Sequence, residues 1–172
     1  NTPFVGRAAD LAALAEQLAR PSCRLLTLIG PGGIGKTRLA LQAAAAQIEN
    51  FRDGVYFIAL APLNSAEQIV PALAEALRFA FHNREPLLEQ LLRYLSGRQL
   101  LLVVDNFEHV MEGAEIVGQV LQRAAQVRIL VTSLERLNLI EEELYLLQGM
   151  ALPESVSDPQ FETYSAIRLF EQ

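Results

Sequence analysis

The sequence holds few of the residues that stabilise secreted or metal-dependent domains. It contains one cysteine, Cys23, and two histidines, His82 and His109. One cysteine cannot form an internal disulfide, and the two histidines lack the clustered partners of a zinc site. We therefore exclude a disulfide scaffold and a structural zinc site, and we expect a reducing, cytoplasmic setting.

Long hydrophobic runs and an excess of basic charge are also missing. The longest core-like stretch, 100–104, is followed at once by Asp105, whereas a membrane-spanning helix needs about 20 apolar residues. Lysine and arginine together number 14 against 20 acidic residues, which gives a net charge of −6 and a pI near 5.0. Binding to a nucleic-acid backbone requires clustered basic residues. We therefore expect neither membrane contact nor direct nucleic-acid contact through this domain.

The sequence does contain a large apolar fraction arranged in alternating strand and helix patterns. Its 172 residues, 51% of them hydrophobic, are enough for one domain with its own core. Strands are predicted at 24–29, 55–60, 99–104, 128–132 and 144–147. Helices are predicted at 7–19, 36–48, 65–79, 86–97 and 113–125. This alternation predicts an α/β fold, a three-layer sandwich with a mainly parallel five-stranded sheet.

A glycine-rich segment lies between the first predicted strand and the helix that follows it. Residues 30–37 satisfy the P-loop pattern G-x-x-x-x-G-K-[S/T] in the required strand-to-helix context. Backbone N–H groups, that of Ile34 included, can surround phosphate oxygens here because four residues lack a side chain: Gly30, Gly32, Gly33 and Gly35. Lys36 would place its charge on the β- and γ-phosphates, and the Thr37 hydroxyl would bind Mg²⁺. The motif predicts a P-loop NTPase fold that binds ATP or ADP with Mg²⁺.

An acidic residue emerges from the end of the aliphatic run. Asp105 would lie at the C-terminal edge of the sheet, where open α/β folds bind ligands, and could reach the Mg²⁺ held by Thr37. The next residue, Asn106, cannot act as a general base because its side chain does not titrate. Glu108 is the nearest candidate to orient or deprotonate an attacking water, with a solvated loop glutamate as the open alternative. We therefore expect slow hydrolysis, with Lys36, Asp105 and Glu108 as the catalytic candidates.

Other polar residues stand near the predicted ends of strands and loops. The hydroxyl of Thr132, at the end of the fourth strand, could contact the γ-phosphate, although capping of a turn or helix would explain Thr132 and Ser133 equally simply. The remaining cations that could bind the nucleotide are Arg7, Arg38 and Arg136, and an ordinary surface position is the alternative for each.

Several segments taken together resemble one group of P-loop proteins. The segments are Phe4–Arg7, Leu28–Ala40, Val103–His109, Val131–Ser133 and Ala151–Pro153. In order and spacing they are similar to STAND ATPases, and more narrowly to the NB-ARC-like domains of large bacterial transcriptional regulators. The resemblance runs from about Thr2 to Pro153. It implies an ATP/ADP switch whose slow hydrolysis controls neighbouring helical, sensor and effector domains, often through self-association of the ATP-bound form.

The resemblance also implies roles for single residues and reveals a departure from the family pattern. By matching position, Val5, Gly6 and Arg7 would line the adenine pocket. The family usually has an arginine directly after the Thr-Ser pair, where it contacts the γ-phosphate, but this sequence has Leu134. Arg136, two residues later, could take its place if the loop is shifted.

The chain ends inside an apolar pattern that is typical of an unfinished helix. We expect residues 1–152 to form the P-loop domain and 153–172 to be a linker and the truncated start of a following helical domain. Two other functions remain open at this point. One is a P-loop small-molecule kinase, against which the single arginine of 134–147 and the three consecutive glutamates Glu141 to Glu143 argue. The other is a P-loop scaffold for protein contacts that no longer hydrolyses ATP.

Overall fold

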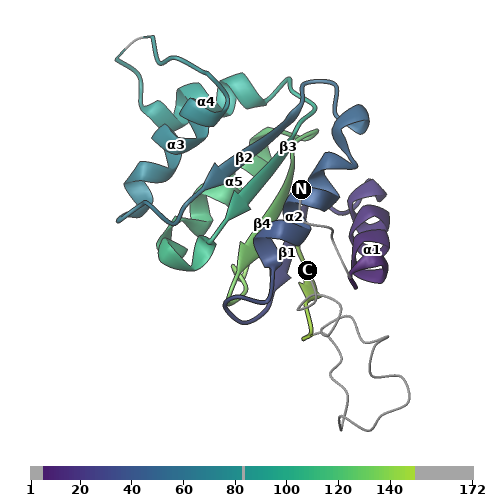
Figure 1. Cartoon of the computed structure of the whole chain (residues 1–172). Coiled ribbons are helices and arrows are strands. Elements are labelled where there is room, and N and C mark those ends of the chain that lie inside the picture. The colour runs from purple at the N-terminus through teal and green to yellow at the C-terminus, as the bar shows by residue number, and fades with distance from the viewer. Residues whose placement is uncertain (1–5, 83, 150–172) are drawn as a thin grey trace, which may run out of the picture.

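Five parallel strands form the sheet at the centre of the molecule. The computed structural model describes residues 6–82 and 84–149. In this part of the chain the strands run in the order β2-β3-β4-β1-β5, and every pairing between neighbours is parallel (Figure 1). Their bounds are Leu25–Ile29 (β1), Val55–Ala59 (β2), Leu101–Asp105 (β3), Arg128–Ser133 (β4) and Glu142–Leu146 (β5). The predicted α/β fold and its five strands are confirmed.

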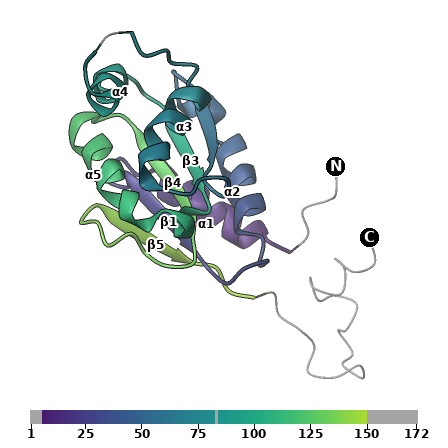
Figure 2. The same ribbon diagram turned by 90° about the vertical axis from the view of Figure 1, so that its left-hand side faces the viewer.

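Helices cover both faces of the sheet and give the molecule three layers (Figure 2). One face carries α1 (Ala8–Ala19) and α2 (Lys36–Ala45), and the other carries α3 (Ile69–Ala76), α4 (Leu87–Leu95) and α5 (Ala114–Arg123). Within residues 6–82 and 84–149 there are also four short 3₁₀ turns: Ile48–Asn50 (η1), Ala66–Gln68 (η2), Phe107–His109 (η3) and Met111–Gly113 (η4). No helix in the described residues combines the length and the apolar character that crossing a membrane requires.

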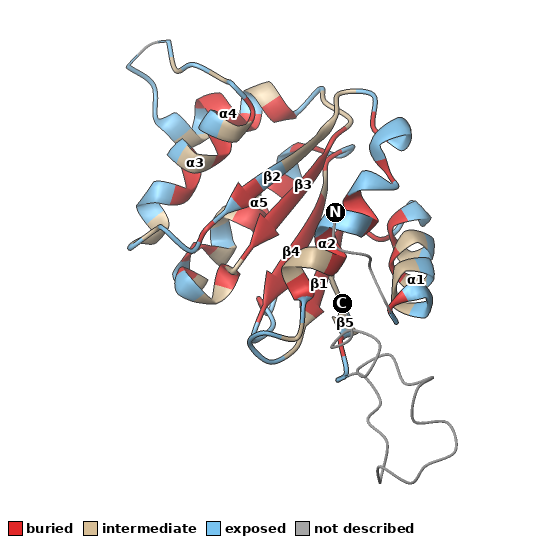
Figure 3. Ribbon diagram, in the orientation of Figure 1, coloured by how far each residue is buried: buried red, intermediate tan, exposed pale blue. Residues whose placement is uncertain are grey.

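Strands β1, β3 and β4 are almost entirely buried (Figure 3), and the side chains that alternate along them divide the core into two layers. One layer packs on α1 and α2 and takes its strand residues from Leu26, Leu28, Leu101, Val103 and Leu130. The other packs on α3, α4 and α5 and takes Leu25, Leu102, Val104, Ile129 and Val131. By the same alternation, Asp105 and Thr132 lie on the α2 side of the sheet. Because all strands are parallel, their C-terminal ends also meet at one edge, which brings these two residues close to the P-loop.

The structure differs from the sequence-based prediction in the positions of several boundaries. The helix predicted over 65–79 begins with η2, and α3 is only eight residues long. Pro71 lies in its first turn, where an N–H group has no partner within the helix. The last strand pairs with β1 from Glu142, two residues before the predicted start. Its Leu144 and Leu146 remain 40% and 66% exposed, because the helices of that face do not extend over β5.

Candidate functional site

The loop between β1 and α2 has the backbone geometry that its glycines predict at three of four positions. Gly33 and Gly35 have positive φ angles of 75° and 94°, which side-chain-bearing residues rarely adopt. A Cβ on Gly30 would stand 3.0 Å from the carbonyl oxygen of Leu147. A Cβ on Gly32 would meet nothing within 4 Å, so space alone does not require a glycine there. The loop is exposed and leads straight into the first turn of α2.

The ammonium group of Lys36 is held by the P-loop itself. Its Nζ donates to the carbonyl oxygens of Gly30, at 2.6 Å, and Pro31, at 3.1 Å. Lys36 is only 7% exposed, and it is the only lysine in the sequence. The charge therefore already lies over the loop that would surround a phosphate. A phosphate oxygen would compete with these two carbonyl groups for the N–H donors of Lys36.

Two hydroxyl groups converge on one oxygen of Asp105. Thr37 Oγ1 donates to Asp105 Oδ1 at 2.7 Å, and Thr132 Oγ1 donates to the same oxygen at 2.6 Å. Asp105 is 5% exposed, so these bonds replace most of its hydration. A carboxylate and a hydroxyl in direct contact are the oxygen donors that Mg²⁺ takes, and the residues present therefore fit the predicted ion. Thr37 and Asp105 are in direct contact, and the Mg²⁺ that the sequence predicts between them stays a prediction.

Thr132 is completely buried, and its hydroxyl is committed to the end of β3. Besides donating to Asp105, its oxygen accepts the backbone N–H of Asn106 at 3.0 Å. A hydroxyl has a single proton to donate. The predicted contact of Thr132 with a γ-phosphate would therefore require the bond to Asp105 to be given up.

Asn106 and Glu108 form a small polar group directly after β3. Asn106 has a left-handed backbone with φ of 62°, a conformation that asparagine tolerates better than most residues. Its side-chain Nδ2 donates to Glu108 Oε1 at 3.4 Å. The other oxygen, Glu108 Oε2, is buried without a hydrogen-bond partner among the described residues. Glu108 is thus not the freely solvated loop residue that was the alternative, and its catalytic role stays a prediction.

Arg7 lies beside the P-loop and contacts three separate parts of the chain, while its place in an adenine pocket stays a prediction. Its guanidinium donates to the carbonyl oxygens of Gln148 at 2.8 Å and Ile34 at 3.4 Å, and it pairs with Asp10 at 3.1 Å. The other oxygen of Asp10 accepts the hydroxyl of Tyr145 at 2.6 Å. Burial, followed by this bond, raises the pKa of Tyr145 to about 12. This network joins α1, the P-loop and the residues that follow β5.

Other predicted residues lie in the loop after β4, on α2 or outside the described residues. Arg136 is exposed and donates to Asn138 Oδ1 at 2.6 Å, which holds it within the loop between β4 and β5. Leu134 is 50% exposed, and Ser133 accepts the N–H of Glu135 at 3.2 Å, as expected of a turn cap. Arg38 lies on α2 after Thr37. Gly6 is exposed, whereas Val5 and the segment 153–172 lie outside the described residues.

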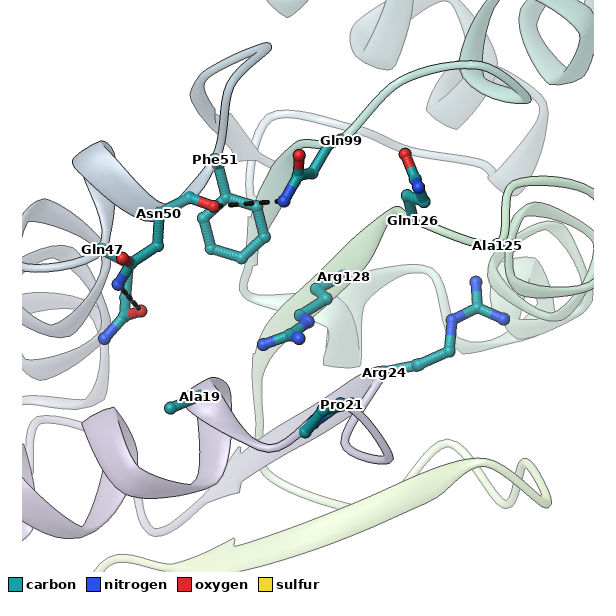
Figure 4. Close-up of a pocket in the computed structure, with 10 residues that line it drawn as sticks. All are labelled: Ala19, Pro21, Arg24, Gln47, Asn50, Phe51, Gln99, Ala125, Gln126 and Arg128. Atoms are coloured by element: carbon teal, nitrogen blue, oxygen red, sulfur yellow. Dashed lines mark hydrogen bonds between the residues drawn. The ribbon is translucent and has the colours of Figure 1, made fainter.

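A hollow of about 440 Å³ lies at the opposite edge of the sheet and is lined by arginine and carboxamide side chains (Figure 4). Arg24 donates to the carbonyl oxygens of Leu121 at 2.6 Å and Ala124 at 2.7 Å, at the end of α5. Burial lowers the pKa of Arg24. Arg128 donates to Leu18 at the end of α1 and lies over the ring of Phe51 at 5.7 Å. Both arginines therefore cap helix ends, far along the strands from the P-loop.

Known proteins with this sequence pattern identify the family. A family model described as an AAA domain (AAA_22) matches residues 19–142, which include the P-loop, Asp105 and Thr132. The chain belongs to the AAA domain family. It is a nucleotide-binding ATPase domain of the P-loop type, and the predicted P-loop NTPase fold agrees with this assignment.

Relatives of this AAA domain are longer proteins. A Mycobacterium tuberculosis protein, provisionally named an HTH-type transcriptional regulator, is 33% identical over 143 residues. The match covers 83% of this chain but only 16% of that protein.

Solved structures show the same fold at low sequence identity. Cdc6p from Pyrobaculum aerophilum aligns with a TM-score of 0.60 and 17% identity, over 78% of this chain and 40% of that one. A STAND protein with a tetratricopeptide repeat sensor, from Pyrococcus horikoshii, aligns with a TM-score of 0.54 and 19% identity, over 86% of this chain and 24% of that one. Both likenesses concern the architecture of the AAA domain.

Proposed function

We propose that this AAA domain is an ATP/ADP switch that binds the nucleotide with Mg²⁺, hydrolyses ATP slowly and controls neighbouring domains of a longer regulator. The observation that carries the proposal is the contact of Thr37 with Asp105 under a P-loop that already holds Lys36. Support for the regulatory part comes from the provisional name of the mycobacterial relative and from the resemblance to STAND ATPases.

Different residues of the chain would bind the phosphates and the Mg²⁺ of the nucleotide. Exposed N–H groups of the loop and the first turn of α2 would bind phosphate oxygens, with the positive helix end adding to the attraction. Lys36 would transfer its donors from Gly30 and Pro31 to the β- and γ-phosphates. Thr37 and Asp105 would hold Mg²⁺, which, when bound, neutralises charge on the phosphates.

Slow turnover follows from what surrounds the γ-phosphate position. Asn106 carries no titratable group, so Glu108 is the residue we propose to orient the attacking water, through its carboxylate with one unpartnered oxygen. Leu134 supplies no charge where the resembling family has an arginine, and Arg136 is bound to Asn138 instead. A weakly stabilised transition state would give the long-lived ATP state that a switch needs.

Communication with neighbouring domains would begin at the end of β5. Arg7 connects the carbonyl of Gln148, just after β5, with Ile34 in the P-loop. We propose that the following helical, sensor and effector domains respond to nucleotide through this connection, with self-association of the ATP-bound form. Because the sequence carries a net charge of −6, we place any nucleic-acid contact outside this AAA domain, and we propose a cytoplasmic protein without membrane contact.

Calorimetric titration of the 172-residue chain with ADP and ATP, each with and without Mg²⁺, tests the proposal. Binding by the wild type that is lost in Lys36→Ala, and that no longer depends on Mg²⁺ in Asp105→Ala, is the expected result. If neither the wild type nor Lys36→Ala binds ADP or ATP, the proposed switch is wrong.

A non-hydrolysing scaffold is the second candidate, favoured by Leu134 and by Arg136, whose side chain is bound to Asn138. Phosphate release from ATP over several hours distinguishes the two. Turnover that disappears in Asp105→Ala supports the switch, whereas tight binding without turnover supports the scaffold. Transfer of the γ-phosphate to metabolites in place of water would instead reveal a small-molecule kinase.

A further inference from the structure

Thr132 is a fully buried polar residue near the P-loop, and its side-chain hydrogen bonds lead to the end of β3. Its side chain is 0% exposed, its hydroxyl donates to Asp105 Oδ1 at 2.6 Å, and its oxygen accepts the N–H of Asn106 at 3.0 Å. The hydroxyl thus fixes a carboxylate and the backbone of the next residue at the same time. Because Asn106 has a left-handed backbone, the turn that begins there is also fixed by this bond.

The second donor to Asp105 differs from Thr132 in its accessibility. Thr37 lies on α2 beside the exposed P-loop, where its oxygen can bind a metal ion while its hydroxyl still donates to Asp105. Thr132 cannot take part in this way because it is enclosed in the sheet. Its bond therefore holds Asp105 in place whether or not a nucleotide is bound.

We propose that Thr132 is a positioning residue that orients Asp105 toward the metal ion and makes no contact with the γ-phosphate. The inference rests on the proposed function, since it concerns the Mg²⁺ of that same site. Outer residues that hold a metal ligand by a hydrogen bond typically change metal affinity about 10- to 100-fold when they are removed. Thr132 would act on Mg²⁺ affinity through Asp105, leaving the contacts of the P-loop with phosphate intact.

The neighbouring strand provides a matched control for a purely structural role. Thr27, in β1, is also 0% exposed and donates to a carboxylate, Glu142 Oε1, at 2.7 Å. Its side chain lies on the opposite face of the sheet from Thr132, by the alternation that separates the two core layers. Replacing either threonine by valine removes one buried hydroxyl from a carboxylate, but only one of these carboxylates belongs to the proposed metal site.

The test compares Thr132→Val, Thr132→Ser and Thr27→Val with the wild type in ADP titrations across a range of Mg²⁺ concentrations. We expect the Mg²⁺ concentration at half-maximal effect to rise about tenfold in Thr132→Val and to return near the wild-type value in Thr132→Ser. Affinity for ADP in EDTA should stay within about twofold of the wild type in all three variants. Thr27→Val should lose stability yet keep the Mg²⁺ requirement of the wild type.

Several outcomes would overturn the inference. An unchanged Mg²⁺ requirement in Thr132→Val, or the same rise in Thr27→Val, would reduce Thr132 to a structural residue. Loss of ATP affinity in EDTA, with ADP affinity kept, would make it a γ-phosphate contact instead. If the wild type itself binds no nucleotide, the proposed function fails together with the inference. If the wild type binds and only the Thr132 variants behave otherwise than expected, the inference alone fails. If Thr132→Val does not fold, Thr132→Ala supplies the same comparison without added bulk at the β-carbon.

Discussion

The two edges of the sheet carry opposite kinds of polar group. At the C-terminal edge, α2 begins beside the P-loop, and hydroxyl and carboxylate side chains lie under that loop. At the N-terminal edge, α1 and α5 end, and two arginines donate to their last carbonyl groups. The polarity of helices explains this difference, because a helix is partly positive at its first residues and partly negative at its last. The first edge therefore attracts anions, and the second attracts cations.

Cavity size would have pointed to the wrong edge. The hollow of about 440 Å³ lies at the N-terminal edge, whereas the P-loop is an exposed segment. An anion in the hollow would compete with the helix carbonyls that Arg24 and Arg128 already satisfy (Figure 4). The C-terminal edge is distinguished by α2, whose first turn points toward the P-loop, and by the hydroxyl groups of Thr37 and Thr132 that donate to Asp105. Neither feature depends on the volume of a cavity.

The largest effect on function is expected at the C-terminal edge from Lys36→Ala. Removing the ammonium group should lower ADP affinity by about 100-fold or more, about 3 kcal/mol, because no other lysine can replace it. Stability should change by about 1 kcal/mol or less, since the carbonyls of Gly30 and Pro31 lie in an accessible loop. Calorimetry with ADP and urea unfolding measure the two quantities.

Arg136→Ala is the matched control for the loss of charge. Its side chain is held by Asn138 in an exposed loop, and we expect its removal to leave ADP affinity unchanged. A loss of ATP affinity in this variant would show that the loop between β4 and β5 reaches the γ-phosphate.

At the N-terminal edge, Arg24→Met should lower the stability of the fold and leave nucleotide affinity unchanged, the reverse of Lys36→Ala. Methionine keeps the apolar stem but leaves the carbonyls of Leu121 and Ala124 without their donor, which should lower the free energy of unfolding by about 2 to 3 kcal/mol. Nucleotide affinity should stay at the wild-type value. Thermal unfolding and the ADP titration are measured on the same preparation. A fall in nucleotide affinity without a fall in stability would contradict the assignment of this edge to structure.

Two glycines, Gly30 in the P-loop and Gly97 before β3, extend the comparison between the two edges of the sheet. In Gly30→Ala the new Cβ would stand 3.0 Å from the carbonyl oxygen of Leu147 and 3.2 Å from Ile34, so the P-loop must shift. We expect a stability loss of about 1 to 3 kcal/mol together with weaker ADP binding. In Gly97→Ala, before β3, the Cβ would meet nothing within 4 Å, and a gain of about 0.4 to 1 kcal/mol is expected. Urea unfolding measures the free energy of unfolding of both variants. A similar loss of stability in Gly30→Ala and Gly97→Ala would contradict the prediction.

The sequence predicted what local patterns determine. The P-loop, the aliphatic strand before Asp105 and the approach of Thr37 to Asp105 follow from a contiguous motif and from the rule that parallel strands end at one edge. The start of β5 was predicted two residues late, because pairing with β1 begins at two glutamates that carry no apolar signal. Glu142 is retained there by Thr27 and by the N–H groups of Leu137 and Asn138, contacts that strand propensity does not describe.

Partners of single side chains were harder to predict. Arg7 reaches Gln148, 141 residues away in the sequence, and its bond with Asp10, only three residues along, was also missed. The role of Thr132 depends on whether its hydroxyl donates to Asp105 or to a phosphate, and the sequence alone does not give the distance to either acceptor. Counting alternate residues along β3 and β4 would have placed Asp105 and Thr132 on the same face and is the signal that could have found their contact.

The smallest expected effect again separates the two edges, and it comes from the buried thiol of Cys23 and the half-buried hydroxyl of Tyr145, which both lose a proton at alkaline pH. Burial, with Glu143 next, raises the pKa of the Cys23 thiol from 9.0 to about 11, and burial, with Asp10 next, raises that of Tyr145 from 10.0 to about 12. A raised folded pKa contributes stability that is complete below the unfolded pKa and is lost as the pH rises through the folded one. The contribution of Cys23 should therefore fade between pH 9 and 11, and that of Tyr145 between pH 10 and 12.

Urea unfolding of the wild type, Cys23→Ala and Tyr145→Phe at half-unit steps from pH 8 to 11 resolves these two contributions. The difference between wild type and Cys23→Ala should begin to shrink near pH 9, and the difference for Tyr145→Phe about one unit higher. Only Tyr145→Phe should also change nucleotide affinity, because Tyr145 reaches the P-loop through Asp10 and Arg7. An equal effect on affinity in Cys23→Ala would mean that the two edges are coupled through α1, and the separation drawn between them would fail.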